Sequence, residues 1–236
     1  AAAMQVVHVH QPLPPIYRTL EAALELDLKN GMRDYLDATV KGLAENMDFR
    51  AGPVLLNGRA GETVARHASD SGADLLVMAT QGRGPFGSMW FGSVADALVR
   101  QSPIPILFVR PNDTSSEPHS GPVRNILVPL DASAPPEEAL EPALALCGEQ
   151  GHVTLLRVIP AVFSTGAGRP SRRMSELGVT VLQQLEELTH QHMGEAGEYL
   201  EKVAERLRAR SVRTQTQVIA HDQPAYAILD AAAKHG

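Results

Sequence analysis

The sequence predicts an α/β fold with two doubly wound, parallel-sheet domains in tandem. Three observations predict it. Apolar runs of strand length alternate with helical patterns throughout the 236 residues, as in parallel βαβ units. Residues 111–123, PNDTSSEPHSGPV, interrupt the alternation with a cluster of turn-forming residues, after which the pattern restarts. Residues 54–72 also align without a gap over 218–236, which indicates an internal repeat.

The first repeat is predicted to contain four buried strands with helices between them. The strand runs are MQVVHV, GPVLL, DLLVMAT and IPILFV, at residues 4–9, 52–56, 74–80 and 104–109. Each run is short and rich in aliphatic residues, which is typical of a strand that is buried on both faces. The stretches between them predict helices near 18–46, 60–71 and 93–101.

The second repeat is predicted to begin with the strand RNILVPL at 124–130. A helix from about Pro135 follows, since proline suits the first helical turn, and it is expected to end near Cys147. The remaining predicted elements are the strand HVTLLRVI at 152–159, a long helix near 176–209, the strand RTQTQVIA at 213–220 and the helix PAYAILDAAAKH at 224–235.

Composition excludes several classes of function. The formal net charge of -6 argues against a surface for nucleic acid, because binding to phosphates requires clustered Lys and Arg. No apolar run approaches the length of about 18 residues that predicts a transmembrane helix, so no membrane partner is expected. Cys147 is the single cysteine, which agrees with a reducing compartment. We therefore expect a cytoplasmic protein.

The segment MATQGRGPFGSMWFGSVADALVRQSPIPILFVRP, residues 78–111, admits two interpretations. In the first, GRGPFG has the G-x-G-x-x-G spacing of a dinucleotide-binding turn, and Asp113 is the candidate ribose contact. This interpretation requires a helix from about Gly84 to Val99. Gly92 would then lie in the helix interior, where glycine costs about 1 kcal/mol relative to alanine.

In the second interpretation, Gly92 and Ser93 begin the helix, with Ser93 as the N-cap. Backbone amides near Gly82, Gly92, Ser93 and Val94 would then hold phosphates at a helix N-terminus. Arg83 would add positive charge. This interpretation predicts a loop, not a helix, over residues 84–92.

The same segment resembles the nucleotide-binding segment of universal stress proteins. ATP-binding members of that family have a glycine, two residues, a second glycine, nine residues and then Gly-Ser or Gly-Thr. Gly82, nine residues and Gly92-Ser93 fit this frame, while Ala79 stands at the first glycine position. Residues 126–160 independently resemble the opening strand, helix and second strand of the family. The two resemblances cover nearly the whole chain.

The resemblance implies two flavodoxin-like domains, each with a five-stranded parallel sheet. We expect the first domain over 1–112, a linker over 113–122 and the second domain over 123–236. Compared with the family plan, the first domain lacks its first strand and helix. The second lacks its last two strands and phosphate loop, so we expect a fragment of a longer tandem protein. As an alternative, the 125–130 strand crosses over to fill the vacant strand position of the first domain.

The resemblance also implies a stress-response protein that binds ATP or a related adenine nucleotide as a regulatory ligand, with Mg²⁺ as its counter-ion. The family's adenine contacts fall on the backbone near Val9, and its adenosine-contacting aspartate falls on Asp131. Asp131 or Ser133 has a simpler alternative role as a helix cap. We expect a homodimer or an intramolecular pairing of the two domains.

Two other functions stay open. The first is a dimerising interaction module that binds no nucleotide, which Ala79 favours, and the second is an NAD-dependent oxidoreductase. We expect no enzyme beyond slow, incidental ATP hydrolysis, because no nucleophile elbow and no Walker lysine is present. We also expect no metal site, since His8 with His10 and His190 with His192 lack zinc-ligand spacing.

Overall fold

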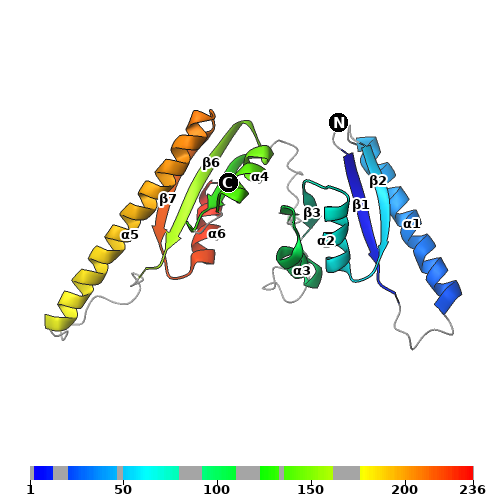
Figure 1. Cartoon of the computed structure of the whole chain (residues 1–236), viewed down its shortest axis with the longest axis horizontal. Coiled ribbons are helices and arrows are strands. Elements are labelled where there is room, and N and C mark those ends of the chain that lie inside the picture. The colour runs from blue at the N-terminus through cyan, green and yellow to red at the C-terminus, as the bar shows by residue number, and fades with distance from the viewer. Residues whose placement is uncertain are drawn as a thin grey trace. The chain divides into compact units, whose positions relative to one another are not determined.

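The computed structural model of the chain describes residues 3–12, 21–46, 50–79, 92–109, 123–132, 136–161 and 176–235. It divides into two compact units, Ala1–Glu117 and Pro118–Gly236 (Figure 1). The boundary falls within the predicted linker, whose residues lie outside the described part of the chain.

The first unit alternates strands with helices. Its elements are β1 Ala3–His10, α1 Glu21–Asn46, β2 Arg50–Asn57, α2 Ala60–Asp70, β3 Leu76–Ala79, α3 Ser93–Gln101 and β4 Ile106–Val109. β1 pairs in parallel with β2, in a register that sets His10 opposite Asn57. β3 pairs in parallel with β4 and sets Leu76 opposite Ile106. The described residues of this unit therefore form two parallel strand pairs.

The second unit contains one three-stranded parallel sheet in the order β5-β6-β7. Its elements are β5 Val123–Pro129, the 3₁₀ helix η2 Pro136–Ala139, α4 Leu140–Leu146, β6 Cys147–Ile159, α5 Glu176–Ala209, β7 Arg213–Ala220 and α6 Pro224–His235. All strand pairs of both units are parallel, so the predicted parallel α/β class is confirmed.

Helices lie on both faces of the β1-β2 pair and on both faces of the β5-β6-β7 sheet. In the first unit, α1 and α2 both pack on β1 and β2, and Figure 1 shows them on opposite sides of the pair. In the second unit, α5 packs on β6 and β7, whereas α4 and α6 lie on the other side of the sheet. Right-handed crossovers that run in opposite directions along a sheet place their helices on opposite faces. Both units are therefore doubly wound.

The central strand β6 supplies the centre of the second core. Val153, Leu155 and Leu156 are fully buried there, because β6 is paired on both edges and covered on both faces. The helix α5 adds Leu200 and Val203 to the same cluster. In the first unit the buried helix residues include smaller side chains, such as Ala65 and Ala95.

The two repeats bury corresponding helix faces. When the gapless alignment of 54–72 over 218–236 is continued towards the N-terminus, Leu36 of α1 falls on Leu200 of α5. These two leucines are 2% and 0% exposed. The alignment therefore pairs residues of α1 and α5 that are buried against the sheet in the same way.

One predicted boundary in the second unit was wrong. The helix expected from about Pro135 to Cys147 is present as the 3₁₀ turn η2 followed by the short helix α4, which ends at Leu146. β6 begins at Cys147 and not at residue 152, because Cys147 is extended and lies opposite Val123 of β5. Gly148 and Gly151 weaken any continuation of the helix. No helix in the described ranges is long and apolar enough to cross a membrane.

We predict that Gly61→Ala destabilises the first unit. An added Cβ would lie 2.6 Å from Cβ of Ala97, so α2 and α3 would have to move apart. Overpacking of this kind costs about 1–3 kcal/mol, which exceeds the gain of about 1 kcal/mol in helix propensity. Thermal unfolding followed by circular dichroism measures the change. The control Gly194→Ala has open space around its Cβ in α5 and should be neutral or stabilising.

We also predict a pH-dependent contribution from the ion pair of Glu141 and Arg210. Arg210 Nη1 and Nη2 donate to the two carboxylate oxygens of Glu141 at 2.5 and 3.1 Å. These hydrogen bonds hold the pKa of Glu141 below its usual value of 4.5. A lowered carboxyl pKa stabilises the fold above the unfolded-state value, and this stabilisation is lost as pH falls through the folded-state value.

Glu141→Gln should therefore be less stable than the wild type at pH 7 and equally stable well below pH 4.5. Urea denaturation across this range measures the difference. Arg210→Gln should give the same pH profile, and the double variant should lose no more than either single variant. A difference between wild type and Glu141→Gln that is independent of pH would contradict the prediction.

Candidate functional site

The N-terminus of α3 is the best-defined part of the predicted site. Gly92 is the N-cap, with extended backbone angles of φ -71° and ψ 165°. The first helical hydrogen bond runs from the Asp96 amide to the Gly92 carbonyl at 3.0 Å. The amides of Ser93, Val94 and Ala95 therefore precede the first helical donor, and helix geometry offers them no acceptor. Such amides, with the helix dipole, favour an anion.

The structure corrects one detail of this end. Ser93 was predicted as the N-cap, whereas it is the first helical residue and Gly92 precedes it as the cap. Glycine is also accepted at this position. The extended Gly92 also interrupts the helix from about Gly84 to Val99 that the dinucleotide interpretation requires. Gly82 and Arg83 lie outside the described residues.

The end of β1 lies close to the same helix terminus. His10 ends β1, and its carbonyl accepts a hydrogen bond from the Gly58 amide at 3.0 Å. Gly58 has φ +140° and leads directly into α2, whose second residue is Gly61. A Cβ on Gly61 would lie 3.6 Å from the carbonyl oxygen of Val94. The turn Gly58–Gly61 thus joins the end of β1, which includes Val9, to the first turn of α3.

A histidine with a buried side chain lies at this end of β1. His10 is 2% exposed, and its Nε2 lies 3.4 Å from Oε1 of Glu25 in α1. Lys29 Nζ lies 2.9 Å from the same Glu25 oxygen. Hydrogen bonding and charge from Lys29 are the main causes that hold the pKa of Glu25 below its usual value. The i, i+4 spacing of Glu25 and Lys29 could have predicted their ion pair from the sequence.

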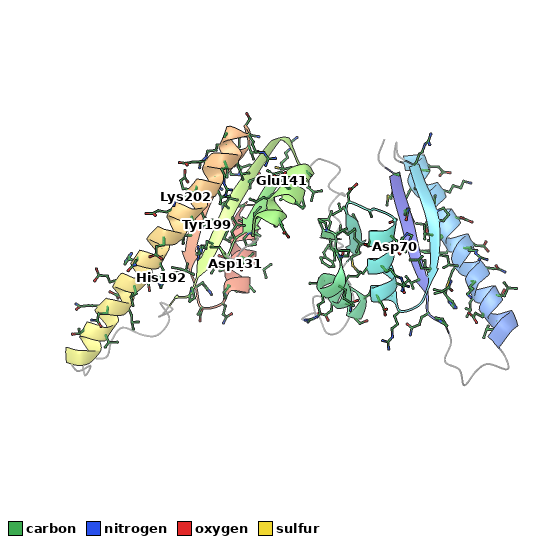
Figure 2. All side chains as sticks on the ribbon, viewed as in Figure 1. Asp70, Asp131, Glu141, His192, Tyr199 and Lys202 are labelled. Carbon is green, nitrogen blue, oxygen red and sulfur yellow. The ribbon has the colours of Figure 1, made fainter. Side chains whose placement is uncertain are left out.

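Asp131 belongs to the second unit. It follows β5, and the Leu130 amide before it donates to the Leu156 carbonyl of β6 at 2.8 Å. Ala132, directly after Asp131, has φ 61°, which is the left-handed region of the backbone. Asp131 is labelled in Figure 2. Ser133 lies outside the described residues. β5 pairs with β6 of its own unit. The alternative in which this strand crosses over to fill the vacant position of the first unit is therefore wrong, because β6 occupies its edge and β5 belongs to the sheet β5-β6-β7.

The second unit has a cavity of about 230 Å³ at the other end of its strands. Its lining includes Asn125, Thr154, Gln215 and His235. Gln215 Nε2 donates to Thr154 Oγ1 at 2.8 Å, which satisfies the buried hydroxyl. Asn125 and Asp131 are six residues apart on an extended chain, or about 20 Å. This cavity is therefore separate from the strand ends where Asp131 lies.

The histidines are dispersed. His8 contacts the ring of Tyr35, with ring centroids 6.3 Å apart, whereas His190 and His192 are exposed on α5. Within the described ranges, no group of three or more His, Cys, Asp or Glu side chains is arranged to hold a metal ion.

The chain is similar to known proteins over nearly its whole length. The model of the universal stress protein family matches residues 2–110 and 122–236. A universal stress protein of Thermus aquaticus is 33% identical over 109 residues, which cover 46% of this chain and 78% of that protein.

A solved structure of a universal stress protein from Archaeoglobus fulgidus has the same fold. It is 13% identical, with a TM-score of 0.61 over 99% of this chain and 71% of that chain. The predicted family, the tandem organisation and the flavodoxin-like fold class are thus confirmed. The two matched segments together show that the chain belongs to the universal stress protein family and carries two family domains in tandem.

Proposed function

We propose that this stress-response protein binds ATP or a related adenine nucleotide through its first unit, as a regulatory ligand with Mg²⁺ as its counter-ion. The observation that carries the proposal is the N-terminus of α3. The amides of Ser93, Val94 and Ala95 are available there, directly after a glycine without a side chain to block a phosphate. Gly82 and Arg83 would complete the cradle.

The neighbourhood of β1 supports a place for the adenosine. Open parallel sheets accept ligands at the carboxyl ends of their strands. The Gly58–Gly61 turn holds the end of β1 next to the first turn of α3. A nucleotide with its phosphates on α3 would therefore lay its base towards Val9 and His10. Arg59, exposed in the same turn, supplies a cation for the phosphates.

Asp131 occupies a comparable strand end in the second unit. It is exposed at the carboxyl end of β5, beside the central strand β6. We propose that its carboxylate contacts the adenosine part of a nucleotide at the strand ends of that unit. Carboxylates accept hydrogen bonds from ribose hydroxyls in nucleotide-binding α/β folds.

Calorimetric titration with Mg-ATP tests the phosphate cradle. We expect Gly92→Asp to weaken binding at least about tenfold, because its carboxylate would take the helix amides and repel phosphate. Aspartate is also a good N-cap, so α3 should keep its stability. Gly92→Val should weaken binding as well, by blocking close approach to the amides.

Gly194→Asp is the control. Gly194 is exposed on α5, with open space around its Cβ position. The variant adds the same charge away from both sets of strand ends and should leave ATP affinity unchanged. Equal affinity of wild type and Gly92→Asp would reject the cradle. A wild type that binds no ATP, with no shift in melting temperature at millimolar ATP, would favour the interaction module that binds no nucleotide.

A further inference from the structure

One face of α1 carries an exposed line of apolar and small residues, the α1 stripe. Its members are Leu24, Leu28, Gly31, Tyr35, Ala38 and Gly42. They recur at alternating spacings of four and three residues, which aligns them along one side of a helix. Leu24, Leu28 and Tyr35 are 48%, 39% and 62% exposed. A contiguous apolar line of this kind, unlike scattered apolar residues, indicates an interaction surface.

Most of the α1 stripe lies off the face of α1 that packs on the sheet. That face contains Leu36, and Tyr35 is the stripe residue that contacts the sheet, through the ring of His8 in β1, while it stays 62% exposed. In the second repeat, Leu24 and Tyr35 correspond to Leu188 and Tyr199 of α5. The other four positions of the stripe are polar or charged there: His192, Glu195, Lys202 and Arg206. Figure 2 shows His192, Tyr199 and Lys202 along α5. The same fold therefore tolerates a polar stripe, and the apolar one belongs to α1 alone.

We propose that the α1 stripe binds the α1 stripe of a second copy of this chain, with the two helices antiparallel about a two-fold axis. An axis between Gly31 and Tyr35 sets each large side chain against a small one. The opposed pairs are Leu24 with Gly42, Leu28 with Ala38, and Tyr35 with Gly31 of the second copy. Alternating large and small residues at facing positions allow two helices to pack closely.

A parallel arrangement does not give this match. It would set Tyr35 against Tyr35 and Gly31 against Gly31, which crowds one layer and leaves a gap in another. The Cβ positions of Gly31 and Gly42 face open space: apart from the adjacent residues and the backbone of the helix itself, no atom lies within 4 Å of them. Both glycines therefore leave room for a side chain from outside.

The charges beside the stripe also favour the antiparallel pair. Asp27, Asp34 and Lys41 are exposed along its outer flank. In the antiparallel arrangement Asp27 faces Lys41 of the second copy, and the two-fold axis makes this pair twice. Asp34 faces Asp34 of the second copy, and these two like charges repel each other once in the dimer. Opposite charges at such flanking positions set the orientation of paired helices.

Sedimentation equilibrium of the full chain tests the pairing. We expect the wild type to shift from monomer to dimer over about 1 to 200 µM, the range of weak homodimers. A monomer throughout this range would overturn the proposal.

Gly31→Gln tests the surface. The added Cβ has open space around it and glutamine improves helix propensity, so the variant should not unfold α1. It fills the space opposite Tyr35 and should raise the dimer dissociation constant at least about tenfold. The matched control Gly194→Gln lies in open space on α5 and should leave dimerisation unchanged. An unchanged dimer in Gly31→Gln would show that another surface pairs the chains.

The flanking charges test the orientation. Asp27→Lys and Lys41→Asp should each weaken the dimer, and the double variant should restore it, because the pair reforms with its signs exchanged. Asp34→Asn should tighten the dimer by removing the repulsion at the axis. Failure of the double variant to restore association, or a weaker dimer in Asp34→Asn, would overturn the antiparallel arrangement.

Discussion

The turn Gly58–Gly61 is the contact on which the proposed binding edge of the first unit depends. At one end, the Gly58 amide bonds the carbonyl of His10 at the end of β1. At the other, Gly61 lies so close to α3 that a single Cβ would meet Ala97. Positive φ at Gly58 lets the chain make this turn without strain. A strand end and a helix N-terminus are thereby held at one edge, which the proposed nucleotide site requires.

The two repeats show which residues the fold needs and which it leaves to function. Leu36 and Leu200 occupy equivalent positions and are both buried, because each helix must cover a parallel sheet. Away from that face the repeats diverge. Gly31 and Ala38 in α1 correspond to Glu195 and Lys202 in α5. Sheet packing cannot explain this difference, because both positions lie off the buried face.

Sequence reasoning succeeded where the signal was local. Continuous aliphatic runs predicted the strands, and Gly92 followed by Ser93 predicted where α3 begins. It failed where the outcome depends on distant residues. β6 begins at Cys147 because β5 offers Val123 as its neighbour there. The N-cap is Gly92 and not the predicted Ser93, because the backbone of Gly92 is extended. Residue preference alone does not determine these backbone angles.

The sequence by itself determined the parallel α/β class, the tandem repeat, the family and the glycine frame around Gly92. These features depend on local periodicity and on the spacing of residues along the chain. Only the tertiary structure decided that His10 is buried beside Glu25, and that the Gly58–Gly61 turn joins β1 to α3. It also decided that the α1 stripe faces outward. Crossover connections bring residues that are distant in the sequence together in space. Which face of a helix is buried and which is exposed depends on how the helix packs on the sheet.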